Sequence, residues 1–347
     1  TLAIVAALTG VAALPPAAET YPSRPVTIID PYPAGGLGDI LPRAMAQVLQ
    51  EQTGQTFIID NKPGATQVIG TRIAAHAAPD GYTILFGSVT SMALNPILKK
   101  NLPYDPLKDF EPIALTYESP MYLVTRPGLK VISVKDLIAL AKSEPKKLTY
   151  SSGGVGSSSH LAAELFNTMA GTSMTHVPYS GTGPAIRDTM AGVVDLTFTA
   201  SGMSYASQGQ VKALATTGAT RSKSAPNVPT LAESGLKGYE ATIWFGFFAP
   251  AGTPKPVVEQ LYAEMKKAVD SGALRDRLRA ANDQVERPSP PTPPPSPART
   301  PWPGARSRSP RPRARCVRSA PCSWGCRGSG RPPCRTTRRR RPSRRAA

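Results

Sequence analysis

The sequence predicts an α/β protein with two lobes, and three observations lead to this fold class. Apolar, strand-like runs alternate with amphipathic, helix-like runs through most of the chain, which is typical of parallel sheets. Four of the strands end in loops rich in glycine, serine and threonine, and each loop leads toward a helix. Two of these loops come before residue 120 and two come after it. Because open parallel sheets bind ligands outside the carboxyl ends of their strands, we expect the two lobes to face a common cleft.

The first lobe is expected to open with a strand at residues 26–29, followed by a loop and a helix that begins near Asp39. Glycines in the loop leave the first N–H groups of the helix open, and such a helix start attracts anions. Pro42 fits only if Asp39 is near the N-cap, because proline is tolerated in the first turn of a helix and not in its interior. A carboxylate at Asp30 would repel an anionic ligand.

The remaining elements follow from the same patterns. Further strands of the first half are expected at residues 57–59, 82–86, 113–117 and 121–125, with a helix at 68–77 and a polar loop at 87–91. Ser133 and Asp136 resemble a capping box at the start of the next helix. Later strands are expected at 148–151, 175–179, 193–199, 211–216 and 243–249, with loops at 152–159 and 180–184 and helices at 161–170 and 254–269.

Charge divides the 347-residue chain into two unlike regions. Residues 1–286 carry 24 Lys and Arg against 23 Asp and Glu, whereas residues 287–347 carry 17 Arg and no acidic residue. The net charge of +18 therefore belongs to the tail, and the body is nearly neutral. A body of this length can bury a sizeable core.

Residues 1–18 are apolar and rich in alanine, which predicts a secretory signal peptide, truncated at its start, with cleavage after Ala18. This run is shorter than the roughly 20 apolar residues that a membrane-spanning helix needs. We therefore expect an exported protein.

Residues 287–347 predict a disordered tail, since they combine many prolines and arginines without periodicity. An Arg-rich tail binds nucleic acid or an anionic surface nonspecifically, which gives a second function hypothesis. Lysine is absent as well, and acidic residues stop after Glu286, which indicates out-of-frame reading of GC-rich coding DNA. All four cysteines lie in this tail without C-x₂-C spacing, so we expect no metal site there.

Common catalytic signatures are absent from the sequence, including G-x-S-x-G, the P-loop and H-E-x-x-H. His160 follows three serines at a helix start and suggests a Ser–His pair. Adjacent helical residues point about 100° apart, so Ser159 and His160 cannot pair with each other. An enzyme on the same fold is the third hypothesis, and His76 and His176 are assigned structural roles.

Several ordered motifs resemble the solute-binding proteins of tripartite tricarboxylate transporters, the Bug family. The similarity runs from Tyr21 to about Asn282. The motifs are Pro31-Tyr-Pro-Ala-Gly-Gly36, Asp60-Asn-Lys-Pro-Gly-Ala65, Ala78-Pro-Asp-Gly-Tyr-Thr83, Leu102-Pro-Tyr-Asp-Pro106, Gly156-Ser-Ser-Ser-His160, His176-Val-Pro-Tyr179 and Trp244-Phe-Gly246.

The resemblance implies a periplasmic protein of the type II binding-protein architecture, with two mixed or mostly parallel sheets flanked by helices, a hinge and an interlobe cleft. The lobes would comprise residues 19–120 plus 226–286, and residues 121–225. Such a protein captures a small dicarboxylate, tricarboxylate or acidic amino acid and delivers it to the integral permease subunits of a transporter. The resemblance implies no cofactor, no metal, no catalysis and no specific nucleic acid.

The resemblance also places a set of residues in the cleft by their position in the motifs. They are Tyr32, Ala34, Gly35, Gly36, Asp39, Ser88, Thr90, Ser91, Gly154, Gly156, Ser157, Ser158, Ser159, His160, Tyr179, Gly181, Thr182 and Thr199. Thr199 and Ala200 stand where the family commonly has an Asp-Asn pair. The tail replaces the closing helical segment of the family, so we expect a poorly stable product.

Overall fold

The computed structural model describes residues 21–281, of which Arg279, Ala280 and Ala281 are described by backbone alone. The predicted signal peptide at residues 1–18 and the predicted tail at residues 287–347 lie outside the described residues. The hypothesis of nucleic-acid binding depends on that tail and lies outside them too.

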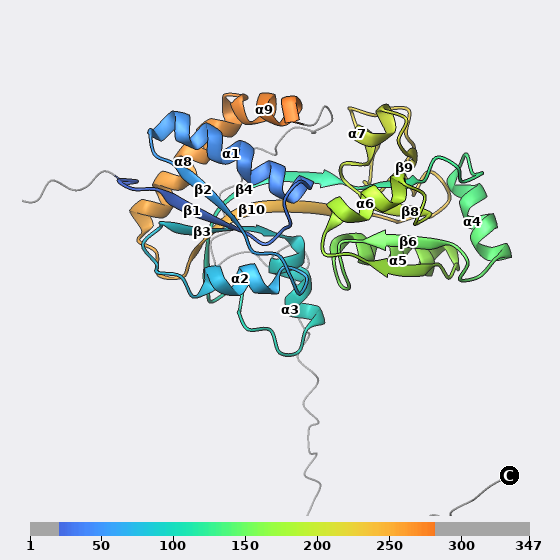
Figure 1. The fold of residues 1–347 in the computed structure, drawn as a ribbon, viewed down its shortest axis with the longest axis horizontal. Helices are drawn as coiled ribbons and strands as arrows, with labels where there is room; N and C mark the ends of the chain where they lie inside the picture. Colours follow the sequence, from blue (N-terminus) through green and yellow to red (C-terminus); the bar gives the residue numbers. More distant parts are fainter. Residues whose placement is uncertain (1–20, 282–347) are drawn as a thin grey trace, which may run out of the picture. The chain divides into compact units, whose positions relative to one another are not determined.

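The first sheet contains five strands in the order β2-β1-β3-β10-β4 (Figure 1). β1 (Val26–Asp30) pairs in parallel with β2 (Phe57–Asn61) and β3 (Thr83–Ser88). β10 (Thr242–Pro250) pairs antiparallel with β3 and with β4 (Phe110–Pro120). Because helices cover both faces of the sheet, the central strand β3 is buried from Ile84 to Ser88.

Helices cover this sheet on opposite faces (Figure 1). α1 (Leu37–Thr53), α8 (Lys255–Asp270) and α9 (Ala273–Ala281) contact one another on one face. α2 (Val68–Ala75) lies on the other face and contacts β1 and β3. A π-helical turn, η1 (Thr90–Leu94), and the short α3 (Asn95–Leu98) follow β3 directly.

The second sheet also has five strands, in the order β7-β6-β8-β5-β9. β6 (Thr149–Ser152) pairs in parallel with β7 (Thr175–Pro178) and β8 (Leu196–Thr199). β5 (Tyr122–Thr125) pairs antiparallel with β8 and with β9 (Lys212–Thr216). The predicted class, two mixed sheets flanked by helices, is therefore confirmed.

Four helices accompany the second sheet. α5 (Ser158–Ala170) and α6 (Thr182–Met190) contact β6 and β8, and lie on opposite faces of the sheet in Figure 1. α7 (Gly202–Ser207) contacts β5 and β9. α4 (Val134–Ser143) begins after Ser133, whose hydroxyl oxygen accepts a hydrogen bond from the Asp136 N–H, as the capping prediction requires.

The chain crosses between the two sheets once at Met121 and again after β9. Residues 229–231 still run alongside β9, because the Thr216 N–H donates to the Pro229 carbonyl and the Leu231 N–H donates to the Thr216 carbonyl. The limits of the two lobes remain a prediction. The hydrogen bonds between residues 229–231 and β9 favour ending the second lobe at about Ala241 rather than at residue 225.

Two helix starts differ from the sequence prediction. α1 begins at Leu37, two residues before Asp39, with Gly36 as its N-cap, so Pro42 lies inside the helix and not in its first turn. The physical reason is that the Asp39 carboxylate bonds backward to the Gly35 N–H in the loop instead of capping the helix. α5 begins at Ser158, three residues before the predicted 161, because the Ser157 hydroxyl caps it.

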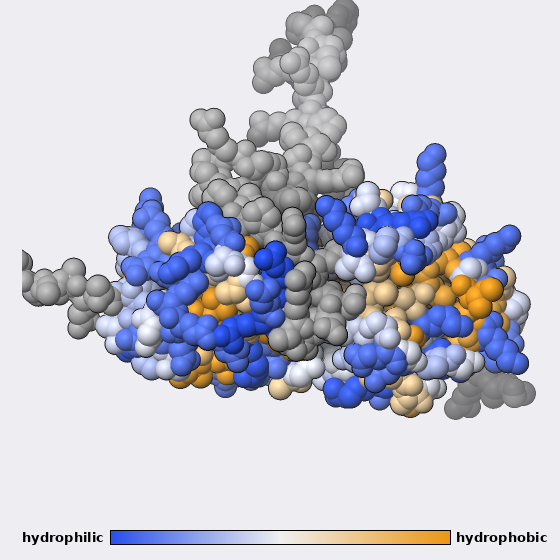
Figure 2. All heavy atoms as spheres, turned by 90° about the horizontal axis from the view of Figure 1, so that it is seen from above, coloured by the Kyte–Doolittle hydropathy of each residue, from blue (hydrophilic) through white to orange (hydrophobic). Residues whose placement is uncertain are grey.

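The surface seen in Figure 2 carries hydrophilic side chains around patches of hydrophobic ones. Single exposed apolar residues such as Ile132 and Val193 are normal for a folded protein. Among the residues that the structure describes, no helix is both long enough and apolar enough to cross a membrane.

Candidate functional site

A cavity lies where the four small-residue loops meet, and each loop contributes lining residues. Tyr32 comes from the loop after β1, Thr90 from the turn after β3, Ser157 from the loop after β6, and Thr182 from the loop after β7. The space between the lining atoms is about 610 Å³, including the part open to solvent.

Three helices begin at this cavity. Leu37 and Gly38 at the start of α1, Ser158 and Ser159 at the start of α5, and Thr182 at the start of α6 all line it. The first N–H groups of a helix have no partner within the helix, and the helix dipole places partial positive charge there. Three such ends around one cavity favour an anion.

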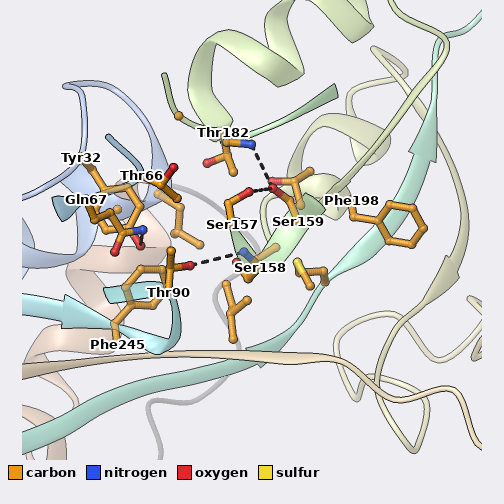
Figure 3. A pocket seen from close by; sticks show the side chains of 18 of the residues that line it. Tyr32, Thr66, Gln67, Thr90, Ser157, Ser158, Ser159, Thr182, Phe198 and Phe245 are labelled. Carbon is orange, nitrogen blue, oxygen red and sulfur yellow. Dashed lines mark hydrogen bonds between the residues drawn. The ribbon is translucent and has the colours of Figure 1, made fainter. Parts of the chain in front are cut away.

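The serine loop before α5 is held by its own hydroxyl groups (Figure 3). The Ser157 and Ser159 hydroxyl oxygens lie 3.1 Å apart, and the His160 N–H donates to Ser157 Oγ at 3.3 Å. The Gly153 N–H donates to Ser159 Oγ at 3.0 Å. These bonds fix the serine loop relative to the cavity.

Two hydrogen bonds join the lobes beside the cavity. The Ser158 N–H donates to Thr90 Oγ1 at 3.3 Å, which is drawn in Figure 3, and Thr66 Oγ1 donates to the Val155 carbonyl at 3.0 Å. The lobes also approach through backbone, since a Cβ built on Gly36 would lie 3.5 Å from the Gly183 nitrogen. The structure therefore shows the lobes in contact.

Sequence reasoning missed Thr66 and Gln67, which line the cavity from the turn after β2. Ala65, Thr66 and Gln67 all have positive φ, at 48°, 57° and 73°. The Gln67 side-chain amide donates to the Tyr32 hydroxyl at 2.7 Å and accepts from Ser88 Oγ at 2.7 Å. A run of three left-handed residues without glycine gives no sequence signal, because this conformation is uncommon for such residues.

The cavity contains eight of the residues that the sequence prediction placed in the cleft. They are Tyr32, Thr90, Ser157, Ser158, Ser159, Gly181, Thr182 and Thr199. Whether any of the eight binds a ligand stays a prediction.

The other ten predicted residues are outside this lining. Gly35 and Gly36 line an adjacent cavity together with Thr182. Ser88 supports Gln67, and Ser91 Oγ accepts from the Ser88 N–H. The remaining residues do not line either of these two cavities and are Ala34, Asp39, Gly154, Gly156, His160 and Tyr179.

The prediction that Asp30 repels an anionic ligand assumed that its carboxylate faces the ligand, and this placement is wrong. Asp30 is fully buried and does not line the cavity. Its carboxyl group accepts hydrogen bonds from the Tyr32 N–H at 3.1 Å and from the Asn61 amide at 2.8 Å. Burial raises the pKa of Asp30 to about 8 against the opposing effect of the Tyr32 hydrogen bond, so the group is largely uncharged at neutral pH.

Asp39 belongs to the same buried network. The Asn61 amide also donates to Asp39 Oδ1 at 2.9 Å, and the Arg43 guanidinium donates to Asp39 Oδ1 at 2.9 Å. Burial alone would raise the pKa of Asp39, but hydrogen bonds from Arg43, the Gly35 N–H and Asn61 hold it below its usual value. The hydrogen bond between the Gly35 N–H and the Asp39 carboxylate therefore holds the loop before α1 in place.

The histidines form a stack with Tyr150 at the side of the second sheet. The His160 and His176 rings lie 4.2 Å apart, and His176 lies 4.9 Å from Tyr150. The Gly156 N–H donates to His160 Nδ1, and Ser152 Oγ lies 2.6 Å from His176 Nε2. Burial, with His160 nearby, lowers the pKa of His176 to about 4. Because Ser152 is fully buried, we assign the contact between Ser152 and His176 a structural role.

Within residues 21–281, no group of three or more His, Cys, Asp or Glu side chains is arranged to hold a metal ion. The anion-favouring features of the cavity come from helix ends and hydroxyl groups.

The fold and the cavity between the sheets define a two-lobed solute-binding receptor. Residues 41–289 match the tripartite tricarboxylate transporter family receptor, and the chain belongs to this family. The curated relatives include protein BugT of Bordetella pertussis, 36% identical over 282 residues, covering 80% of this chain and 86% of BugT. A protein encoded in the tcbD-tcbE intergenic region of Pseudomonas sp. strain P51 is 37% identical, covering 75% of this chain and 78% of that relative. The resemblance to the Bug family is confirmed.

Solved structures of related proteins have the same fold as this chain. R. palustris Rpa4515 with adipate superposes with a TM-score of 0.73 at 36% identity, covering 78% of this chain and 90% of the other. The periplasmic binding protein BugD gives 0.71 at 36% identity, covering 75% and 87%. MatC from Rhodopseudomonas palustris with bound malate gives 0.70 at 34% identity, covering 74% and 88%. These homologues are solute-binding receptors. They give no support to the third hypothesis, which was an enzyme on the same fold.

Proposed function

We propose that this chain captures a small organic carboxylate in the periplasm and delivers it to the integral permease subunits of a tripartite tricarboxylate transporter. The observation that carries the proposal is the meeting of three helix starts, those of α1, α5 and α6, at one cavity. Relatives with bound adipate and malate support the carboxylate class. The periplasmic relatives support the location.

The energetics of such a site are sufficient without an arginine. A micromolar ligand requires about −8.2 kcal/mol of binding free energy. A hydrogen bond to a charged group contributes roughly 1.5–3 kcal/mol, and a helix N-terminus contributes roughly 0.3–1 kcal/mol. Four or five such donors and the three helix starts meet this requirement toward the upper end of these ranges, because the cost of ordering the ligand must be met as well.

The direct test is thermal unfolding of the full chain with a panel of monocarboxylates, dicarboxylates, tricarboxylates and acidic amino acids, each compared with an equal concentration of chloride. A ligand at 100 times its Kd stabilises the folded state by about 2.7 kcal/mol, so we expect a melting temperature several degrees higher. Stabilisation by none of the organic anions contradicts the proposal.

A matched pair of substitutions at Thr182 locates the site. Thr182→Asp places a carboxylate at the first residue of α6, where the helix tolerates it but an anionic ligand is repelled. Thr182→Asn is its neutral control. We expect Thr182→Asp to remove the ligand-induced stabilisation and Thr182→Asn to retain most of it.

A further inference from the structure

The turn before α2 keeps side chains at backbone positions that favour glycine. Ala65, Thr66 and Gln67 all have left-handed conformations, which are unfavourable for a residue with a Cβ atom. Such strain persists only where the surrounding structure holds it in place, and it is common at functional sites. The Asn95 amide holds the turn by donating to the Thr66 carbonyl at 2.9 Å. Thr71 Oγ1 donates to the Gln67 carbonyl at 2.8 Å. The strained turn therefore directs us to what its side chains do.

The side chains of Thr66 and Gln67 differ in whether their hydrogen-bond donors are used. Thr66 Oγ1 donates to the Val155 carbonyl of the other lobe, so its proton has an acceptor. The Gln67 side chain lines the cavity, and the residue is only 7% exposed. Its amide nitrogen carries two N–H groups, and one of them is donated to the Tyr32 hydroxyl. The other has no acceptor within the part of the chain that the structure describes.

The Gln67 amide is held in one orientation by Ser88. The Ser88 hydroxyl oxygen accepts from the Thr90 N–H at 3.2 Å, and its proton is donated to Gln67 Oε1 at 2.7 Å. This bond fixes the oxygen end of the amide and leaves the nitrogen end at Tyr32. Figure 3 shows Gln67 beside Tyr32, across the pocket from Ser157. A buried N–H group without an acceptor is unfavourable, so a ligand oxygen in the cavity would complete it.

We infer that Gln67 orients the captured ligand by donating its second amide N–H to a carboxylate oxygen. This inference rests on the proposed capture of a carboxylate and assigns a role in it to one side chain. Gln67 adds a side-chain donor of the first lobe to the backbone donors at the helix starts. The hydrogen bonds to Ser88 and Tyr32 hold this donor in place before the ligand arrives, which lowers the cost of ordering it.

Two substitutions distinguish a ligand contact from a structural role. Gln67→Met keeps the length of the side chain and removes the donor, but it also loses the bonds to Ser88 and Tyr32. Gln67→Glu keeps an acceptor for both hydroxyl groups and replaces the N–H donor with a negatively charged oxygen. If Gln67 contacts the carboxylate, Gln67→Glu weakens binding more than Gln67→Met. If Gln67 only supports its neighbours, Gln67→Met weakens binding more.

Isothermal titration calorimetry on the full chain measures these affinities with adipate, malate, citrate and glutamate, and with any other anion of the panel that stabilises the wild type. We expect Gln67→Met to bind about tenfold or more weakly than the wild type, and Gln67→Glu about a hundredfold or more weakly. Gln50→Glu is the control, because Gln50 is exposed and lies outside the lining of the cavity. Its affinity is expected to stay within about twofold of the wild type.

The possible failures of the two proposals differ. Unchanged affinity in Gln67→Met, or a larger loss in Gln67→Met than in Gln67→Glu, overturns the role of Gln67 and leaves the proposed function standing. An equal loss in Gln67→Glu and Gln50→Glu also overturns it, because the added charge would then act without contact. A wild type that binds no anion of the panel overturns both proposals.

Discussion

At the scale of single residues, the carboxyl group of Asp30 lies beneath the loop that precedes α1. It accepts hydrogen bonds from the Tyr32 N–H and from Asn61, which also bonds to Asp39. The pKa of Asp30 is raised from 3.8 to about 8 in the folded protein, mainly by burial. The folded state therefore retains a proton that the unfolded chain releases above about pH 4.

This shift predicts a pH dependence of stability. A raised folded-state pKa stabilises the protein fully below pH 4, and the stabilisation is lost as pH rises toward 8. Between these values Asp30 lowers the free energy of unfolding by up to about 1.4 kcal/mol for each pH unit. Asp30→Asn cannot titrate, so we expect the difference in unfolding free energy between the two proteins to change with pH.

Urea denaturation of both proteins at pH 5, 6, 7 and 8 measures that difference. Asp276→Asn is the control, because Asp276 is exposed and its substitution removes one carboxylate without changing the buried network. If the stabilities of the wild type and Asp30→Asn remain parallel across this range, Asp30 does not hold the extra proton.

At the scale of elements, the start of α6 fits closely against the loop after β1. A Cβ built on Gly181 would lie 2.6 Å from the Cγ atom of Pro33, a ring carbon in the opposite lobe that has little freedom to move. The φ of Gly181 is 178°, which any residue adopts, so the glycine is required by space and not by backbone conformation. Because Gly181 has no side chain, the two lobes can come into contact at this point.

Gly181→Ala is therefore expected to hold the cleft partly open. Because only the closed form surrounds the ligand, affinity for the best ligand of the panel should fall by about tenfold or more. Calorimetry measures the affinity, and small-angle X-ray scattering with ligand should show a larger radius of gyration than in the wild type. Gly183→Ala is the control, since its Cβ would meet Gly36 at an ordinary 3.5 Å. Unchanged affinity in Gly181→Ala contradicts this role.

The positions of the four loops could be predicted from the sequence, whereas the apolar lining of the cavity could not. Glycine, serine and threonine at strand ends predict where the chain turns toward a helix, and the loops containing Tyr32, Thr90, Ser157 and Thr182 do meet at one cavity. Met121 and Phe245 could not be assigned to it from sequence, because buried apolar residues look alike whether they fill a core or line a cleft. The direction of Asp30 was likewise set by the path of the following loop and not by its place in the strand.

At the scale of the whole molecule, Thr217 joins the two segments that cross between the sheets. Its N–H donates to the Met121 carbonyl at 2.8 Å, and its carbonyl accepts from the Ala241 N–H at 2.9 Å. Its hydroxyl oxygen accepts from the Met121 N–H at 2.8 Å and lies 2.5 Å from the Ala241 carbonyl, to which it donates. One buried side chain thus fixes both crossings of the hinge relative to each other.

Thr217→Val keeps the shape of the side chain and removes its hydroxyl group. The buried Met121 N–H then loses its acceptor, which typically costs about 1–3 kcal/mol. In a body of this size we expect a fall in melting temperature of roughly 2–10 °C. Thr217→Ser retains the hydroxyl and is expected to lose less stability, although it removes a methyl group. Because the backbone bonds of Thr217 persist in both variants, a Thr217→Val protein as stable as Thr217→Ser would show that the backbone alone holds the crossings together.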